Sequence, residues 1–195
     1  MLIKWIYGRL VPDEDGLYNA GHDYVDLGLS VYWATMNVGA KYDYEYGKCC
    51  GWGGIRNGGT LLWSRYRTEF DPSLYSQKPD YLTTLLLRDD IAHRCMGGDW
   101  RMPTVDEMNE LLTQCSWQAL MINHAIPAYQ VTGPNGNSIL LPKQSLWTSS
   151  LYAKDCEAYC LWFWSGGTLE INYTSRDKMF HVRGVLDKPK EADEK

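Results

Sequence analysis

The side chains that could perform chemistry do not occur at the spacings that catalytic or metal sites use. The histidines are separated by long stretches of chain, at His22, His93, His124 and His181. None belongs to an H-E-x-x-H or C-x-x-C motif, so each is interpreted as structural. The glycine-rich stretch 53–60 lacks the Lys-Ser/Thr pair and the helix-opening context of a phosphate-binding loop. The residues therefore predict no metal, no cofactor and no enzymatic activity.

The six cysteines and the paired carboxylates also have simple structural interpretations. Cys49 and Cys50 are adjacent, and neighbours in sequence rarely form a disulfide with each other. Along one strand, Cys156 and Cys160 would lie about 13 Å apart, beyond the reach of a disulfide unless the chain bends between them. We therefore expect free thiols. The acidic pairs at 89–90 and 106–107 stand where helices begin, and the helix dipole explains them without acid–base chemistry.

Composition indicates one domain and argues against two classes of partner. The chain has 195 residues, is 45% hydrophobic and has a formal net charge of −5. Such a chain can bury one substantial core, and its charge balance favours neither nucleic acid nor an anionic membrane surface. It contains neither an apolar run that could span a bilayer nor a signal-peptide segment, so no membrane insertion is expected. The nine Trp and 14 Tyr against three Phe provide rings with a polar edge, which suit binding surfaces.

Two helices are predicted near the middle of the chain. Thr104 and Glu107 match the S/T-x-x-E capping box, and apolar residues follow at helical spacing from Val105 to about Cys115. A shorter helix is predicted from Asp89 to Cys95, ended by Gly97-Gly98. One face of the longer helix should pack on a core.

The strand patterns are short, closely spaced and separated by Gly, Pro and Asn clusters, which favours antiparallel pairing. Strands are predicted at 24–29, 31–34, 138–142, 160–164, 168–174 and 180–185, with a loop at 47–59. In 160–164 both alternating faces are apolar, so either both faces are buried or one is a binding face. The predicted fold class is α+β, with two helices around small antiparallel sheets and many loops.

Three separated strings carry a family resemblance. They are GHDYVDLGL at 21–29 leading into WATMNVGA at 33–40, GGDWRMPT at 97–104 with Glu107, and LWTSS at 146–150 with Phe180, Val182 and Arg183. Together they resemble the Fibrobacter-type major paralogous domain, a family related to the C-type-lectin and formylglycine-generating-enzyme folds. The resemblance implies a C-type-lectin-like domain over residues 21–186. Residues 1–20 are then expected to form an N-terminal attachment segment, and residues 187–195 a disordered tail.

Some members of this family are variable proteins of diversity-generating retroelements, in which the stretch matching 147–183 varies on a constant scaffold. The matching scaffold positions are Trp147, Ser149, Ser150, Leu161, Phe163, Arg176, Phe180, Val182 and Arg183. The positions matching variable residues, expected to form the ligand-binding surface, are Tyr152, Tyr159, Trp162, Trp164, Glu170, Asn172, Tyr173, Ser175, Asp177 and Lys178. Clustered Tyr and Trp beside Ser, Asn and Asp is also the composition of an adaptable binding face.

The resemblance implies a ligand-recognition protein, similar to receptor-binding proteins of phage tails or of Bacteroidetes cell surfaces. The expected ligand is a host-surface protein or glycan, and a homo-oligomer such as a trimer, or assembly on a larger particle, is a further expectation. The Glu-Pro-Asn, Gln-Pro-Asp and Trp-Asn-Asp strings with which C-type lectins bind calcium are absent. Two alternatives remain. One is a structural or assembly paralogue with the same fold, and the less favoured one is an oxidase of the formylglycine-generating type.

Overall fold

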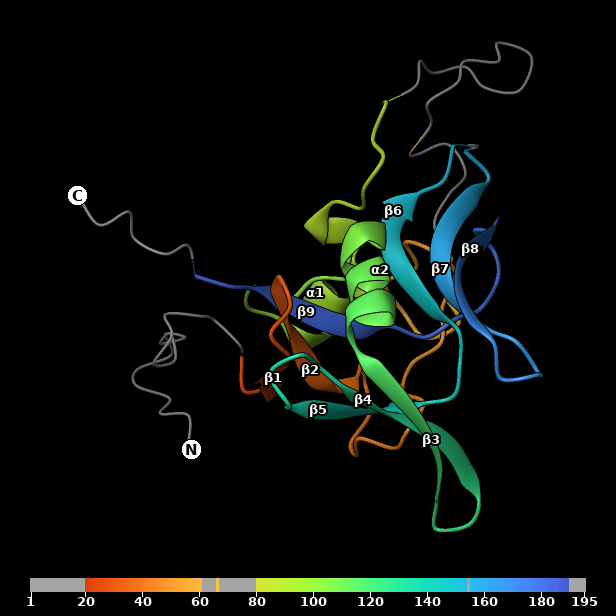
Figure 1. The fold of residues 1–195 in the computed structure, drawn as a ribbon. Helices are drawn as coiled ribbons and strands as arrows, with labels where there is room; N and C mark the ends of the chain where they lie inside the picture. Colours follow the sequence, from red (N-terminus) through yellow and green to blue (C-terminus); the bar gives the residue numbers. More distant parts are fainter. Residues whose placement is uncertain (1–19, 61–65, 67–79, 154, 190–195) are drawn as a thin grey trace.

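The computed structural model describes residues 20–60, 66, 80–153 and 155–189 (Figure 1). Within these residues, three antiparallel sheets and two α-helices make a mostly-sheet α+β fold, in agreement with the predicted fold class. The helices are α1 (Ile91–Met96) and α2 (Val105–Gln114), with a 3-10 turn η1 (Leu87–Asp89) before α1. The sheets have the orders β1-β2-β9, β3-β4-β5 and β6-β7-β8.

The first sheet joins the two ends of the described chain. β2 (Val31–Asn37) lies between β1 (Tyr24–Asp26) and β9 (Arg183–Asp187), and Trp33 is the register partner of Val185. The first strand was predicted to continue to residue 29. It ends at Asp26 because Gly28 adopts a φ of 77° and donates its N–H to the Asp26 carboxylate, which turns the chain.

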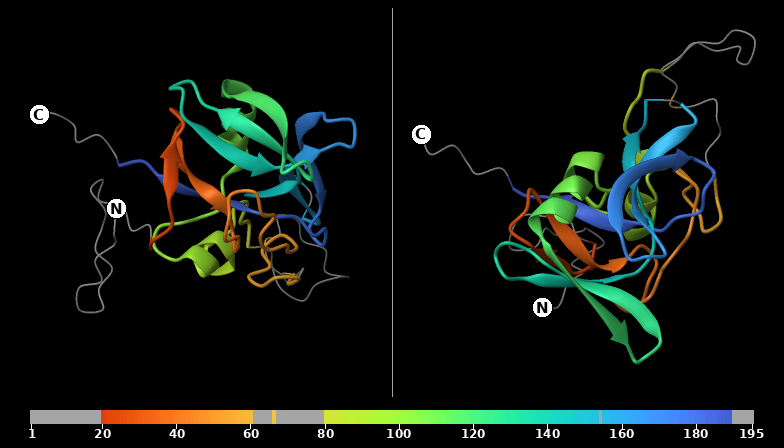
Figure 2. Two further views of the ribbon diagram at one scale, coloured as in Figure 1. Left: turned by 90° about the horizontal axis from the view of Figure 1, so that it is seen from below. Right: turned by 45° about the vertical axis from the view of Figure 1, so that its right-hand side comes forward.

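The other two sheets are each formed by consecutive strands. One contains β3 (Ser116–Ile122), β4 (Ile126–Thr132) and β5 (Ser138–Pro142). The other contains β6 (Leu146–Leu151), β7 (Glu157–Phe163) and β8 (Leu169–Ser175). Figure 2 shows the β3–β4 hairpin extending away from the rest of the molecule, while α2 lies near β6, β7 and β8.

The β6-β7-β8 sheet contributes to two hydrophobic cores because successive strand residues face opposite sides. Ala158 and Cys160 join a core that contains Trp52, Trp100 and Trp147. Leu161, the residue after Cys160 in β7, joins a second core beneath α2 and the β3-β4-β5 sheet. Of the two interpretations left open by the sequence, burial therefore holds for the middle of β7.

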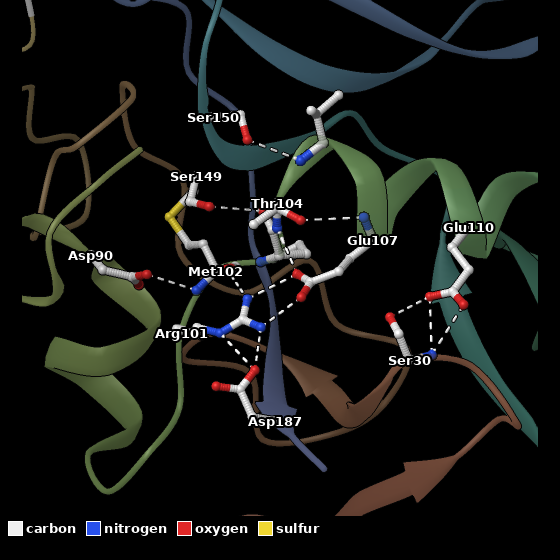
Figure 3. Close-up of polar contacts among 12 residues, drawn as sticks. Ser30, Asp90, Arg101, Met102, Thr104, Glu107, Glu110, Ser149, Ser150 and Asp187 are labelled. Atoms are coloured by element: carbon white, nitrogen blue, oxygen red, sulfur yellow. Dashed lines mark hydrogen bonds and ion pairs between the residues drawn. The ribbon is translucent and has the colours of Figure 1, made fainter. Parts of the chain in front are cut away.

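Both helices are held at their starts by side-chain caps. The Thr104 hydroxyl accepts the Glu107 N–H while the Glu107 carboxylate accepts the Thr104 N–H, the predicted reciprocal capping box (Figure 3). The short helix begins two residues later than predicted because Asp89 ends η1 and Asp90 serves as the N-cap of α1. Gly97, with a φ of 75°, ends α1 as predicted.

Changing Thr104 to alanine is expected to lower the free energy of unfolding by about 1 kcal/mol, because it removes one half of the capping box. Urea denaturation followed by far-ultraviolet circular dichroism measures this loss. Thr104→Ser keeps the hydroxyl acceptor and should retain most of the stability. Equal losses in both variants would mean that the methyl group, rather than the cap, is responsible.

Other predicted boundaries differ in detail or lie outside the described residues. The last strand was predicted from 180, but Phe180 and His181 form only isolated bridges, with Cys50 and Leu146, before β9 begins at Arg183. β9 continues to Asp187, one residue beyond the predicted domain end. Residues 1–19 of the attachment segment predicted at 1–20 and residues 190–195 of the tail predicted at 187–195 lie outside the described residues. No helix of the described part is long and apolar enough to cross a membrane.

Candidate binding surface on the C-terminal sheet

The β7–β8 hairpin carries most of the residues predicted to bind ligand. Its register pairs Tyr159 with Tyr173 and Trp162 with Glu170. Residues opposite each other share a face, and faces alternate along each strand, so these two pairs lie on opposite faces of the sheet. The residues expected to form one contact surface are therefore divided between two.

The first surface, here the tryptophan face, consists of Trp162, Trp164, Glu170 and Asn172. The indole rings lie 5.4 Å apart between centroids, with 36° between their planes. One carboxylate oxygen of Glu170 accepts the indole N–H of Trp164 at 2.9 Å and the side-chain amide of Asn172 at 2.6 Å. These bonds link the Trp164 ring, which follows the end of β7, to the side chains of Glu170 and Asn172 on β8.

The tryptophan face stands on buried aromatic packing. The Trp162 ring meets Phe180 edge-on at 5.3 Å, and Phe180 in turn lies 4.7 Å from buried Trp147. The indole N–H of Trp147 donates to the Cys50 carbonyl oxygen. Trp162 is thus half-buried, whereas 44% of the Trp164 surface is exposed. The tryptophan face therefore has a packed base, Trp162, and one exposed ring, Trp164.

The second surface, here the tyrosine face, consists of Tyr152, Tyr159 and Tyr173. Tyr152 stacks on Tyr173 with ring centroids 3.6 Å apart and meets Tyr159 edge-on at 5.2 Å. The hydrogen bond with Tyr173 raises the pKa of Tyr152 above its ordinary value. Tyr173 is the most exposed of the three, at 42%.

The remaining predicted binding residues follow the end of β8. Ser175 is half-buried, and Asp177 and Lys178 are exposed in the turn after the strand. Between them Arg176 is buried, with its guanidinium 4.8 Å from the centroid of the Trp52 ring and one N–H donated to the Asp155 carbonyl oxygen. Arg176 therefore anchors this turn while its neighbours face outward.

The predicted scaffold residues lie beneath or beside these two surfaces. Phe163 and Phe180 are half-buried, and the others are buried: Trp147, Ser149, Ser150, Leu161, Arg176, Val182 and Arg183. Ser149 and Ser150 connect β6 to the start of α2, because the Ser149 hydroxyl donates to the Pro103 carbonyl and the Ser150 hydroxyl accepts the Val105 N–H (Figure 3). All ten predicted binding residues are at least partly exposed.

One exposed residue of the same region was not singled out from the sequence. Met179 is 43% exposed and directly precedes Phe180, which supports the tryptophan face. Its position after the charged pair Asp177 and Lys178 gave no periodic signal. A flexible thioether beside rigid rings can adapt its shape to a ligand.

Thiol chemistry receives little support from the geometry. Cys156 is exposed before β7 begins, whereas Cys160 is buried within the strand, and both are free. Burial raises the pKa values of Cys50 and Cys160 to about 12 and that of Cys115 to about 11, so these thiols stay protonated at neutral pH. Among the described residues, no group of three or more His, Cys, Asp or Glu side chains could hold a metal ion.

A small cavity of about 120 Å³ lies elsewhere, lined in part by His22, Lys48 and Cys95. The Lys48 ammonium donates to the Cys95 sulfur at 3.2 Å across this lining. Cavities that enclose small-molecule ligands usually measure about 300–1,000 Å³. The surfaces of the C-terminal sheet are therefore better candidates for binding than this cavity.

The sequence matches no protein-family model, and no curated protein or solved structure is significantly similar to it. The class of the protein accordingly follows from its own geometry. It is an α+β protein of small antiparallel sheets whose C-terminal hairpin exposes aromatic rings on both faces.

Proposed function

We propose that this chain is a ligand-recognition protein with a C-type-lectin-like fold, of the kind diversified by retroelements. It presents the tryptophan face to a protein or glycan on a host surface and acts on a virion or at a cell surface. The observation that carries this proposal is the exposed Trp164 ring, held by Glu170 and backed by the half-buried Trp162.

The chain order supports the lectin-like part of the proposal. The N-terminal hairpin β1–β2 pairs with the C-terminal strand β9, and both helices and the other two sheets lie between them in sequence. This pairing joins the two ends of residues 21–186, the range over which the sequence resembles the lectin-like family, as expected for one closed domain. It places a hairpin with exposed rings on a scaffold fixed at both ends.

The energetics of the tryptophan face also suit recognition. A ring already held in one orientation loses little conformational entropy when a ligand covers it. Aromatic anchors of this kind supply most of the binding free energy at many interfaces. The polar atoms of Glu170 and Asn172 lie beside the rings and can confer specificity through hydrogen bonds.

A structural paralogue is the second candidate, and the packing of Trp162 on Phe180 favours it, because a ring that completes a core needs no ligand. The two candidates differ in what happens when the exposed Trp164 ring is removed. Loss of affinity is expected if this ring is a binding anchor, whereas a structural paralogue has no such affinity to lose.

Trp164→Ala is expected to weaken binding about 30-fold or more, equivalent to about 2 kcal/mol or more for an exposed aromatic anchor. Arrays of surface glycans and of host-surface proteins first identify a ligand, and biolayer interferometry then measures the dissociation constants. Tyr81→Ala, at a 69% exposed ring outside the hairpin, is the matched control and should bind like the parent chain.

Tyr173→Ala in the same assay compares the two faces. Loss of affinity in this variant alone would assign binding to the tyrosine face. Unchanged affinity in both hairpin variants would contradict the proposal. The retroelement part has a separate test, which is whether the gene lies near a reverse transcriptase and a near-copy of the codons for 147–183 that differs at adenines.

A further inference from the structure

The β3–β4 hairpin combines features that proteins usually avoid at a sheet edge. Among the described residues β3 pairs with β4 alone, so its outer edge presents unpaired backbone N–H and carbonyl groups. The hairpin also extends away from the body of the molecule (Figures 1 and 2). Exposed edges of this kind accept another strand unless charge, proline or a short strand length prevents it.

None of these protections is present in β3. The strand is seven residues long and contains neither proline nor a charged residue. No Asp, Glu, Lys or Arg occurs anywhere between Glu110 and Lys143, although 22% of the whole chain is charged. By contrast, the edge strand β1 has three residues and ends in Asp26, and β8 carries Glu170.

The side chains of β3 are also unusually apolar for their exposure. Met121 is 55% exposed, Ala119 is exposed, and Leu120 and Ile122 on the other face of the strand are half-buried. Apolar surface on both faces of a projecting hairpin gains from burial against another molecule. The free edge supplies the hydrogen bonds for the same contact.

We propose that β3 is a dimerisation edge, at which two copies of this chain pair antiparallel and join their three-stranded sheets into one. The occupant is a second copy because the N–H and carbonyl groups of this edge can pair with those of the same edge turned by 180°, and no like charges meet between the two strands. Two chains with a net charge of −5 repel each other, and the uncharged stretch is where they can approach. A two-fold contact of this type closes on itself and covers the β3 edge of both copies.

Pairing about a two-fold axis at Ala119, the middle residue of β3, joins all seven residues of each strand. Trp117 of each copy then lies opposite Met121 of the other, and Gln118 lies opposite Leu120. A thioether beside an indole is a favourable contact. The tryptophan face lies on a different sheet, so pairing along β3 does not require that face to bind a ligand.

The test is sedimentation equilibrium of the full chain over a wide concentration range. The parent chain should have the mass of two chains at high concentration. Ala119→Lys combined with Met121→Lys places ammonium groups of the two copies opposite one another and should raise the dimer dissociation constant at least about tenfold. Asn109→Lys, at an exposed position of α2 outside the edge, adds the same kind of charge and should remain dimeric.

Both lysine substitutions fall on exposed side chains, and circular dichroism of each variant verifies that it remains folded. A parent chain that stays monomeric at all concentrations overturns the proposal. So does a dimer that the Ala119/Met121 variant leaves unchanged, because its interface would lie elsewhere.

A cysteine pair tests the register independently. Ala119→Cys should form an intermolecular disulfide under mild oxidation, because the two copies of residue 119 face each other across the axis. Gln130→Cys, on the exposed surface of the central strand β4, is the matched control and should give only the background of the parent chain. Equal cross-linking of the two variants would contradict pairing along β3.

Discussion

Replacing Arg183 with methionine is expected to lower the free energy of unfolding by about 3–5 kcal/mol, a large part of the stability of a typical domain. The Arg183 side chain is fully buried, and its guanidinium donates to the Asn37 side-chain oxygen and to the carbonyl oxygens of Ala34 and Leu140, at 2.8–2.9 Å. It thereby ties β9 to β2 and β5. Methionine fills similar space but removes the donor from three acceptors, of which those of Asn37 and Ala34 are buried and that of Leu140 is partly buried.

Burial lowers the pKa of Arg183 to about 9, so the guanidinium is still charged at neutral pH and its desolvation opposes the gain from these bonds. We expect the loss of the three hydrogen bonds to destabilise the protein by more than removal of the guanidinium desolvation stabilises it. Thermal and urea denaturation of the variant test the balance. Arg88→Met, at a mostly exposed guanidinium, is the matched control and should change stability by less than about 0.5 kcal/mol. Unchanged stability of Arg183→Met would show that desolvation cancels the hydrogen bonds.

Replacing Gly133 with alanine is expected to cost about 2–4 kcal/mol, because the added methyl group has no room. An ideal Cβ at this position would lie 1.9 Å from the Leu27 carbonyl oxygen and 2.7 Å from its carbonyl carbon. Leu27 belongs to the second core, so its backbone cannot move away from Gly133 without disturbing the packing of that core. The amides of Asn135 and Asn137, which donate to the Asp26 carbonyl oxygen, hold the same turn in place.

Gly166→Ala is the matched control for this experiment. A Cβ at Gly166 meets nothing within 4 Å, so its effect should stay within about 0.5 kcal/mol. Both variants can be compared by differential scanning calorimetry. A loss of similar size at both positions would indicate that the lost glycine flexibility, rather than the contact with Leu27, determines the cost.

The elements that could be predicted from the sequence are those whose signals are local. The capping box of Thr104 and Glu107 lies within one helical turn, and Gly97 ends α1 through its own backbone conformation. The alternation of β8 needs only neighbouring residues. In each case the free energy that selects the structure comes from contacts a few residues apart, so the sequence displays it.

The β3–β4 hairpin was missed because its turn has no usual signal. Asn123 and His124 both adopt positive φ, at 49° and 60°, and the Ala125 N–H closes the turn on the Ile122 carbonyl. Histidine in this conformation is uncommon, and Asn-Gly is the usual pair. Packing of Trp117 against Tyr129, distant in sequence, stabilises the hairpin instead.

Local residue patterns were enough to predict the α+β class, the start of α2 and the alternation that turns Trp162 and Leu161 to opposite sides. Which side of each strand meets a core and which meets solvent depends on packing between distant segments. The register of β7 and β8 separated the expected contact residues into a tryptophan face and a tyrosine face. Burial of Arg183 likewise depends on Ala34, Asn37 and Leu140, which lie far from it in sequence. Such contacts form only when distant segments pack together, and no local pattern of residues encodes which segments these are.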